Sequence, residues 1–292
     1  MCVSPKRENS TEPYIISPCR TYLINNKPTI HWNEVPGATS YVVSIMNGSE
    51  VHWQQEVVGT EIVYPGEPLL NSGVLYSIKI ESNNNFLFES VSSEPGSGFR
   101  MLDEELSQNL QNAIADVKQK SAGEESDLEL VGLYMGYGLF VEAIEKLERL
   151  VSMESQVADV YCMLGELYSY VSLPLRARKP LEKALTLLET GCDVKGQIIV
   201  KVALAKVNTA LEEDDKAVGS SLQETQSKFE TLADEEQSKE IQGRLEGLIS
   251  KDWQLVSTMT LAGCQNNCVP SIPDVQGELK GLRRICVPCA SF

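Results

Sequence analysis

Histidine, catalytic motifs and long apolar runs are what this sequence lacks. Only 2 of its 292 residues are histidine, His31 and His52, and both fall in segments with a strand-like pattern. An exposed strand position accounts for each of them. The sequence contains no phosphate-binding glycine loop, no His-Glu-x-x-His motif and no Gly-x-Ser-x-Gly motif. We therefore expect no enzymatic activity and assign no catalytic residue.

Long apolar segments are also missing. No uninterrupted stretch approaches the roughly 18 apolar residues that a membrane-spanning helix needs. The first residues include the basic Lys6 and Arg7, but no apolar segment of the kind found in secretory signals follows them. The expected location is therefore the cytoplasm, although an exported protein whose start is processed or misassigned would look the same.

Basic residues are scarce relative to acidic ones. The chain has 25 Lys and Arg against 41 Asp and Glu, which gives a formal net charge of −16. Residues 101–251 hold 28 of the acidic and 16 of the basic residues. A surface this acidic repels phosphate groups, so nucleic acid and anionic membranes are poor candidates as partners.

The N-terminal third has the alternating pattern of short β-strands. An Asn47-Gly48 pair marks a hairpin, and Pro36-Gly37 marks a turn. Short strands at this spacing predict a small antiparallel β-sandwich. The expected strands cover residues 28–32, 40–46, 51–58, 61–64, 75–81 and 86–92, and a further strand at 14–17 would complete the N-terminal edge.

Two groups of residues in this region resemble a fibronectin type III domain over about residues 25–100. The first group is Trp32, Pro36-Gly37-Ala38 and Tyr41; the second is Leu70, Gly73 and Tyr76. The resemblance implies that Tyr76 is a corner tyrosine whose hydroxyl bonds to the backbone of the preceding turn. Asn71 and Ser72 stand where the family has a proline.

After a Pro95-Gly96-Ser97-Gly98 linker the hydrophobic period changes from two residues to about 3.6. Asp103 precedes a helical pattern that breaks at residues 121–123. The predicted organisation is an irregular lead-in at 1–24, the sandwich at 25–100, a helical repeat domain at 101–251 and a Cys-rich tail at 252–292. The carboxylates of the helical region lie near lysines, as Glu142 does to Lys146, and helical ion pairs explain them.

Two ladders of residues repeat within the helical region. Tyr168 follows Tyr134 by 34 positions, and Ala177 follows Ala143 by the same interval. A period of 34 indicates stacked helix–turn–helix units. The first ladder is Leu130, Tyr134, Gly138, Phe140, Ala143 and Leu147, and the second is Leu164, Gly165, Tyr168, Ala177, Leu181 and Ala184.

The ladders resemble the tetratricopeptide repeat (TPR), with units at about 124–157, 158–191 and, more weakly, 197–232. Small residues lie where two helices cross, large ones fill the space between units, and Gly138 supplies a positive φ in the turn. The third unit would end in a helix at 216–232, followed by a capping helix at 235–249. The predicted fold is thus a small antiparallel sandwich followed by a TPR-type superhelical stack. The pairing of the two parts looks like a group common in cyanobacteria.

The first helix of each repeat in this family lines a concave groove. Family members that hold a C-terminal carboxylate use Lys, Asn and Arg there, whereas this chain has acidic residues. The resemblance therefore implies a preference for a basic or mixed peptide, unless the stack is only a spacer. The expected groove residues are Glu125, Leu128 and Met135, with Gly132 beside them, and Asp159, Glu166 and Ser169, with Cys162 beside them.

The tail holds half of the 8 cysteines. Cys264 and Cys268 form one pair, and Cys286 and Cys289 form a second. Two thiolate pairs make either a tetrahedral zinc site or two disulfides, or the thiols stay separate; the redox compartment decides between these. In an oxidising compartment Cys2 could also pair with Cys19. No cofactor other than zinc is indicated.

These features predict a non-enzymatic scaffold or adaptor that binds another protein through a TPR groove. Two alternatives remain at this stage. One is a zinc-dependent binding module built on the tail cysteines. The other is an envelope or exported accessory protein whose sandwich contacts polysaccharide through Trp53 and Tyr64.

Overall fold

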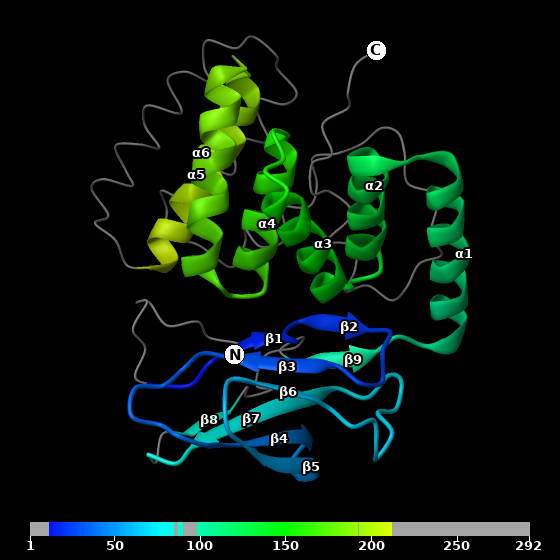
Figure 1. The fold of residues 1–292 in the computed structure, drawn as a ribbon, viewed down its shortest axis with the longest axis vertical. Coiled ribbons are helices and arrows are strands. Elements are labelled where there is room, and N and C mark those ends of the chain that lie inside the picture. The colour runs from blue at the N-terminus through cyan, green and yellow to red at the C-terminus, as the bar shows by residue number, and fades with distance from the viewer. Residues whose placement is uncertain (1–11, 85–86, 90–97, 192, 212–292) are drawn as a thin grey trace. The chain divides into compact units, whose positions relative to one another are not determined.

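The structure is a computed structural model that describes residues 12–84, 87–89, 98–191 and 193–211. Within these residues, 9 strands are followed by 6 helices (Figure 1). This order confirms the coarse prediction of a β domain followed by a helical region. The predicted helices at 216–232 and 235–249 and the Cys-rich tail lie outside the described residues.

The strands form two sheets. One has the order β1-β3-β6, and the other has the order β2-β9-β7-β4-β5 with β8 paired to β7. Every pairing is antiparallel except that of β2 with β9, which is parallel. The strands are β1 (Ile15–Ser17), β2 (Thr21–Leu23), β3 (Thr29–Trp32), β4 (Tyr41–Asn47), β5 (Glu50–Val57), β6 (Glu61–Val63), β7 (Tyr76–Ser82), β8 (Leu87–Glu89) and β9 (Phe99–Met101).

Alternation along the strands places their apolar side chains between the two sheets. In β4, Tyr41, Val43 and Ile45 are buried in this core, while the residues between them face the other side of the sheet. The Asn47-Gly48 hairpin forms as expected, and Gly48 adopts a φ of 59°. The hydroxyl of Tyr76 accepts a hydrogen bond from the backbone N–H of Asn71 at 3.0 Å, which confirms the expected corner contact.

The sandwich extends beyond the predicted limits at both ends. β1 lies where a further strand at 14–17 was considered, β2 lies in the segment expected to be an irregular lead-in, and β9 follows the expected linker. Each of these strands has only 3 residues, too few for an alternating pattern to stand out in the sequence. Their partners come from distant segments, since Thr21 pairs with Phe99.

The helices follow the predicted boundaries closely. Asp103 caps α1, accepting a hydrogen bond from the N–H of Leu106 at 2.8 Å, and the break at 121–123 separates α1 from α2. Asp193 caps α6, which therefore begins at Val194, slightly before the expected start near Gln197. The helices are α1 (Glu104–Lys120), α2 (Gly123–Gly136), α3 (Phe140–Ser152), α4 (Ala158–Tyr170), α5 (Pro174–Thr190) and α6 (Val194–Ala210).

Each ladder occupies one pair of helices, α2 with α3 and α4 with α5. The turn between α2 and α3 contains Gly138 at a φ of 72°, as the sequence predicts, and the turn between α4 and α5 contains Ser172 at 65°. The small ladder residues Ala143, Ala177 and Ala184 are fully buried.

The described chain divides into two compact units. The first lies within Met1–Lys146 and Tyr168–Leu175, and the second lies within Leu147–Leu167 and Arg176–Phe292. The first unit therefore contains the sandwich, α1, α2 and the start of α3. It also contains the turn between α2 and α3 and the turn between α4 and α5. No helix in the described part of the chain is both long and apolar enough to cross a membrane.

Candidate functional site

The predicted groove residues of α2 differ in exposure. Glu125 is exposed and Leu128 is half-buried, but Met135 is only 4% exposed. A ligand could reach Met135 only by displacing its neighbours. On α2, the accessible charged and large apolar side chains of the predicted set therefore lie in the N-terminal half of the helix.

The predicted residues of α4 are half-buried. Asp159, Cys162 and Glu166 belong to the second unit, and Ser169 belongs to the first. Asp159 lies in the first turn of α4. A half-buried side chain keeps part of its surface exposed, so a ligand can still contact it.

The carboxyl group of Asp159 lies in an unusual electrostatic environment. Burial, and then the nearby carboxylate of Asp193, raise the pKa of Asp159 to about 6. Asp193 is the cap of α6 and accepts a hydrogen bond from the N–H of Gly196 at 3.0 Å. Among the described residues, no basic side chain forms an ion pair with either carboxylate. The pair is therefore acidic and not neutralised.

A second polar cluster, which the sequence did not reveal, lies between α2 and α3. Lys146 of α3 forms an ion pair with Asp127 of α2 at 3.0 Å, and both side chains are largely buried. Glu142, the expected partner of Lys146, is not its partner in the structure. The Oε2 atom of Glu142 is buried without a hydrogen-bond partner. The expectation failed because the i,i+4 spacing counts only neighbours on one helix, whereas Asp127 comes from another.

The carboxyl group of Glu142 has a raised pKa. Burial raises its pKa to about 7; a hydrogen bond from its own backbone N–H opposes this shift, and the carboxylate of Glu145 adds to it. Burial, followed by the charges of Glu142 and Asp127, also raises the pKa of Tyr134. The cluster thus has two carboxylates, and the ammonium group of Lys146 is paired with that of Asp127.

The first unit also joins the sandwich to the turn between α2 and α3. The N–H of Tyr22 donates to the carbonyl of Gly138 at 2.8 Å, and the hydroxyl of Thr21 accepts from the N–H of Phe140 at 3.0 Å. Thr21 Oγ1 also lies 3.2 Å from the Gly138 carbonyl oxygen. The sandwich and the first helical pair are therefore in direct contact through β2.

Arg20 makes the corresponding contact with the turn between α4 and α5. Its Nη1 donates to the carbonyl of Tyr170 at 3.2 Å and lies 3.4 Å from the hydroxyl of Ser172. The guanidinium group also lies 5.7 Å from the centroid of the Tyr170 ring. Residues 20–22 thus contact both turns, a role that their place in the expected lead-in did not suggest.

The histidines and the aromatic residues considered for polysaccharide have structural partners. His31 lies 3.4 Å from Glu61, and His52 Nε2 lies 3.2 Å from the carbonyl of Pro68. Tyr64 is 0% exposed, and Trp53 packs edge-on against it with ring centroids 5.3 Å apart. Because Tyr64 is buried, these two rings do not form an exposed platform for a sugar.

Of the cysteines, only Cys19 and Cys162 lie within the described residues. Cys19 is buried and disulfide-bonded, and Cys2 lies outside the described residues. The four cysteines predicted to hold zinc, Cys264, Cys268, Cys286 and Cys289, also lie outside them. Among the described residues, no group of three or more His, Cys, Asp or Glu side chains is arranged to hold a metal.

Comparison with known proteins adds no assignment. The sequence matches none of the protein-family models and none of the curated proteins with which it was compared.

Proposed function

We propose that this chain is a non-enzymatic protein–protein interaction scaffold whose helical pairs form a TPR-type stack and bind a basic or mixed peptide. The observation that carries the proposal is the acidic pair on α4 and α6. Asp159 is half-buried, its pKa is raised to about 6 by burial and by Asp193, and no described cation neutralises it. A Lys or Arg side chain supplied by a partner would offset this repulsion.

The chemistry of the pair supports a cationic ligand. An ammonium or guanidinium group between two carboxylates forms charge-assisted hydrogen bonds, which are roughly twice as strong as neutral ones. Partial burial reduces screening by salt, so the pair attracts a cation more strongly than an exposed pair would. Binding of the cation lowers the pKa of Asp159 and releases any proton that it holds.

The test is peptide binding by the full chain. Fluorescence anisotropy with basic, mixed and acidic peptides is expected to give measurable affinity for the first two classes. Asp159→Asn is expected to weaken binding of the basic peptide about tenfold, which corresponds to about 1.4 kcal/mol. Glu182→Gln, on an exposed position of α5, is the charge-matched control and is expected to leave the affinity unchanged.

The raised pKa of Asp159 determines the direction in which peptide affinity changes with pH. Because the cation binds the ionised form, affinity for the basic peptide should rise as pH increases through about 6, the pKa of Asp159. Equal binding of acidic peptides, or identical affinity in Asp159→Asn and Glu182→Gln, would reject the proposal. Reproducible turnover by the pure protein that is lost on changing one polar side chain would reject its non-enzymatic part.

A further inference from the structure

Strand β5 is the longest strand of the described sandwich, with 8 residues, and it lies at the end of its sheet. Its only strand partner among the described residues is β4. Such an edge presents a row of backbone N–H and C=O groups that a further strand can use. The edge thus has the length and the backbone groups needed to accept an extended segment.

The residues of β5 leave this edge accessible. Five of them are exposed, and none is proline or lysine, the residues that commonly protect natural edges from pairing. The only irregularity is a bulge at the N-terminal end, opposite Ile45 and Met46. Trp53 and Val57 pack on the core and hold the strand in place. The exposed residues of β5 are Glu50, Val51, Gln54, Gln55 and Glu56.

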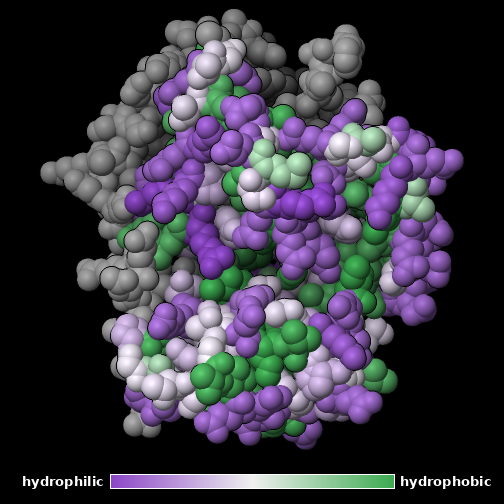
Figure 2. All heavy atoms as spheres, viewed as in Figure 1, coloured by the Kyte–Doolittle hydropathy of each residue, from purple (hydrophilic) through white to green (hydrophobic). Residues whose placement is uncertain are grey.

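An apolar surface lies next to the edge. Val51 of β5 is 57% exposed, and Leu69 is 66% exposed. The contact of His52 with the Pro68 carbonyl brings the Leu69 segment beside β5. Figure 2 shows hydrophobic residues gathered on the visible face of the sandwich, among polar ones. A bound strand would therefore find apolar contacts as well as backbone hydrogen bonds.

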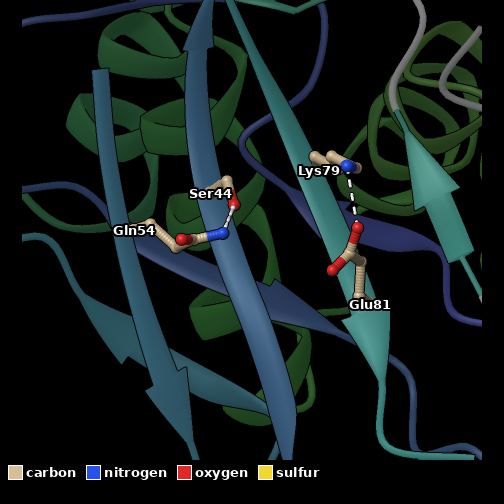
Figure 3. Close-up of polar contacts among 4 residues, drawn as sticks. All are labelled: Ser44, Gln54, Lys79 and Glu81. Carbon is tan, nitrogen blue, oxygen red and sulfur yellow. Dashed lines mark hydrogen bonds and ion pairs between the residues drawn. The ribbon is translucent and has the colours of Figure 1, made fainter. Parts of the chain in front are cut away.

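The charges around the edge are acidic. Glu56, Val42 and Glu81 lie side by side across β5, β4 and β7. Lys79 already forms an ion pair with Glu81 at 2.7 Å, and the neighbouring Gln54 is bonded to Ser44 at 3.0 Å (Figure 3). Glu50 and Glu56 form no ion pair with a described residue. Charge complementarity therefore calls for Lys or Arg on the incoming strand.

The same charges disfavour a second copy of this chain. Pairing of two β5 strands would bring Glu50 and Glu56 of both copies to one shared edge. Like charges directly opposite each other destabilise a strand pair. A net charge of −16 per copy adds to this repulsion.

From these observations we propose that the β5 edge docks an extended segment of a partner protein in which apolar residues alternate with Lys or Arg. The segment adds a strand to the sheet. The bulge places Glu50, opposite Asn47, and Glu56, opposite Val42, on different faces of the sheet. The basic side chains of the segment lie on the face of Glu56, and its apolar side chains lie on the other face, beside Trp53 and Val57. This site is separate from the acidic pair on α4 and α6, so neither proposal depends on the other.

The experiment uses the full chain and a synthetic peptide of about eight residues that alternates Lys and Val, a length that matches one strand. Binding is expected, together with slower hydrogen exchange at the amides of β5. The double variant Glu50→Gln/Glu56→Gln is expected to bind about tenfold more weakly, or about 1.4 kcal/mol. Both proteins carry Asp159→Asn, so that the acidic pair on α4 and α6 does not contribute to binding of this basic peptide.

Three controls make the outcome decisive. Glu34→Gln/Glu105→Gln removes the same charge from exposed positions elsewhere and should bind as the parent does. A peptide with alternate N-methylated amides keeps its charge but loses donors, and should not bind. Thermal unfolding verifies that each variant is folded. Equal binding of the N-methylated peptide, equal weakening in both double variants, or a peptide-free dimer whose β5 amides are protected would overturn the proposal.

Discussion

The two helical pairs share one ladder but are packed differently. Val131 of α2 corresponds to Gly165 of α4, and Leu150 of α3 corresponds to Ala184 of α5, each 34 positions apart. All four positions are buried. A Cβ at Gly165 would lie 2.5 Å from Cγ of Leu181 and 3.1 Å from the carbonyl oxygen of Ala177. The repeat therefore fixes which positions are buried, while side-chain size sets how closely the helices approach.

The turns of the two pairs differ as well. The carbonyl of Gly138 accepts from the backbone N–H of Tyr22 and the hydroxyl of Thr21 in β2, whereas the hydroxyl of Ser172 contacts the side chain of Arg20. Both residues have positive φ. The first turn is thus held by short, buried groups and the second by a long side chain at the surface. This difference predicts that the first turn contributes more to stability.

The largest expected effect concerns the crossing of α4 and α5. Gly165→Ala should lower the free energy of unfolding by about 1–3 kcal/mol, because the added Cβ overlaps Leu181. Gly132→Ala in α2 is the matched variant; its Cβ meets nothing within 4 Å. That change should raise stability by about 0.5–1 kcal/mol through helix propensity. Chemical denaturation measures both, and effects of the same sign would contradict the difference in packing.

A smaller effect is expected where β2 meets the first turn. Thr21→Val keeps the shape of the side chain but leaves the buried N–H of Phe140 without its acceptor, which should cost about 1–2 kcal/mol. Thr21→Ser retains the hydroxyl and is the control. Arg20→Met, at the second turn, should cost only about 0.5 kcal/mol, because the contact of Arg20 with the Tyr170 carbonyl is exposed and that with Ser172 is only partly buried. A larger loss in Arg20→Met than in Thr21→Val would reverse the comparison of the turns.

A pH dependence of stability is also expected from Glu142 in the first helical pair. The pKa of Glu142 is raised from 4.5 to about 7, so the folded protein keeps a proton that the unfolded chain releases at lower pH. The stability from this group is fully present below about pH 4.5 and is lost as pH rises through about 7. At the corresponding position α5 has the exposed Arg176 in place of a carboxylate.

Thermal denaturation of the parent and of Glu142→Gln between about pH 5 and pH 8 measures this effect, since an unperturbed glutamate is ionised throughout that range. The difference between the two proteins isolates Glu142 from Asp159, whose pKa of about 6 lies in the same range. The variant should lose less stability than the parent as pH rises. Parallel pH curves would show that Glu142 is ionised in both states.

The parts of the fold that the sequence predicts are those with local signals. The Asn47-Gly48 hairpin, the Asp103 cap and Gly138 in the turn each depend on a few neighbouring residues. β2 and β9 escaped prediction because 3 residues give no period and their pairing joins segments far apart in the chain.

The candidate sites could be predicted only as far as local sequence patterns reach, because their key contacts join different helices or strands. The 34-residue spacing singled out Asp159, but its neighbour Asp193 comes from another helix, so the electrostatic coupling was invisible in sequence. Glu142 was assigned to Lys146 by spacing on one helix, whereas tertiary structure gives Lys146 to Asp127. The β5 edge depends on strand order, which alternation along a single strand does not encode.

The parallel pairing of β2 with β9 has a mechanical consequence. Thr21, Tyr22 and Leu23 lie opposite Phe99, Arg100 and Met101, and the N–H of Leu102 donates to the carbonyl of Leu23 at 2.8 Å. The chain enters this pair at Thr21 and leaves it after Met101, at opposite ends of two parallel strands. A force that pulls the N-terminal segment away from α1 therefore loads these hydrogen bonds together, in shear, and does not peel them apart one by one.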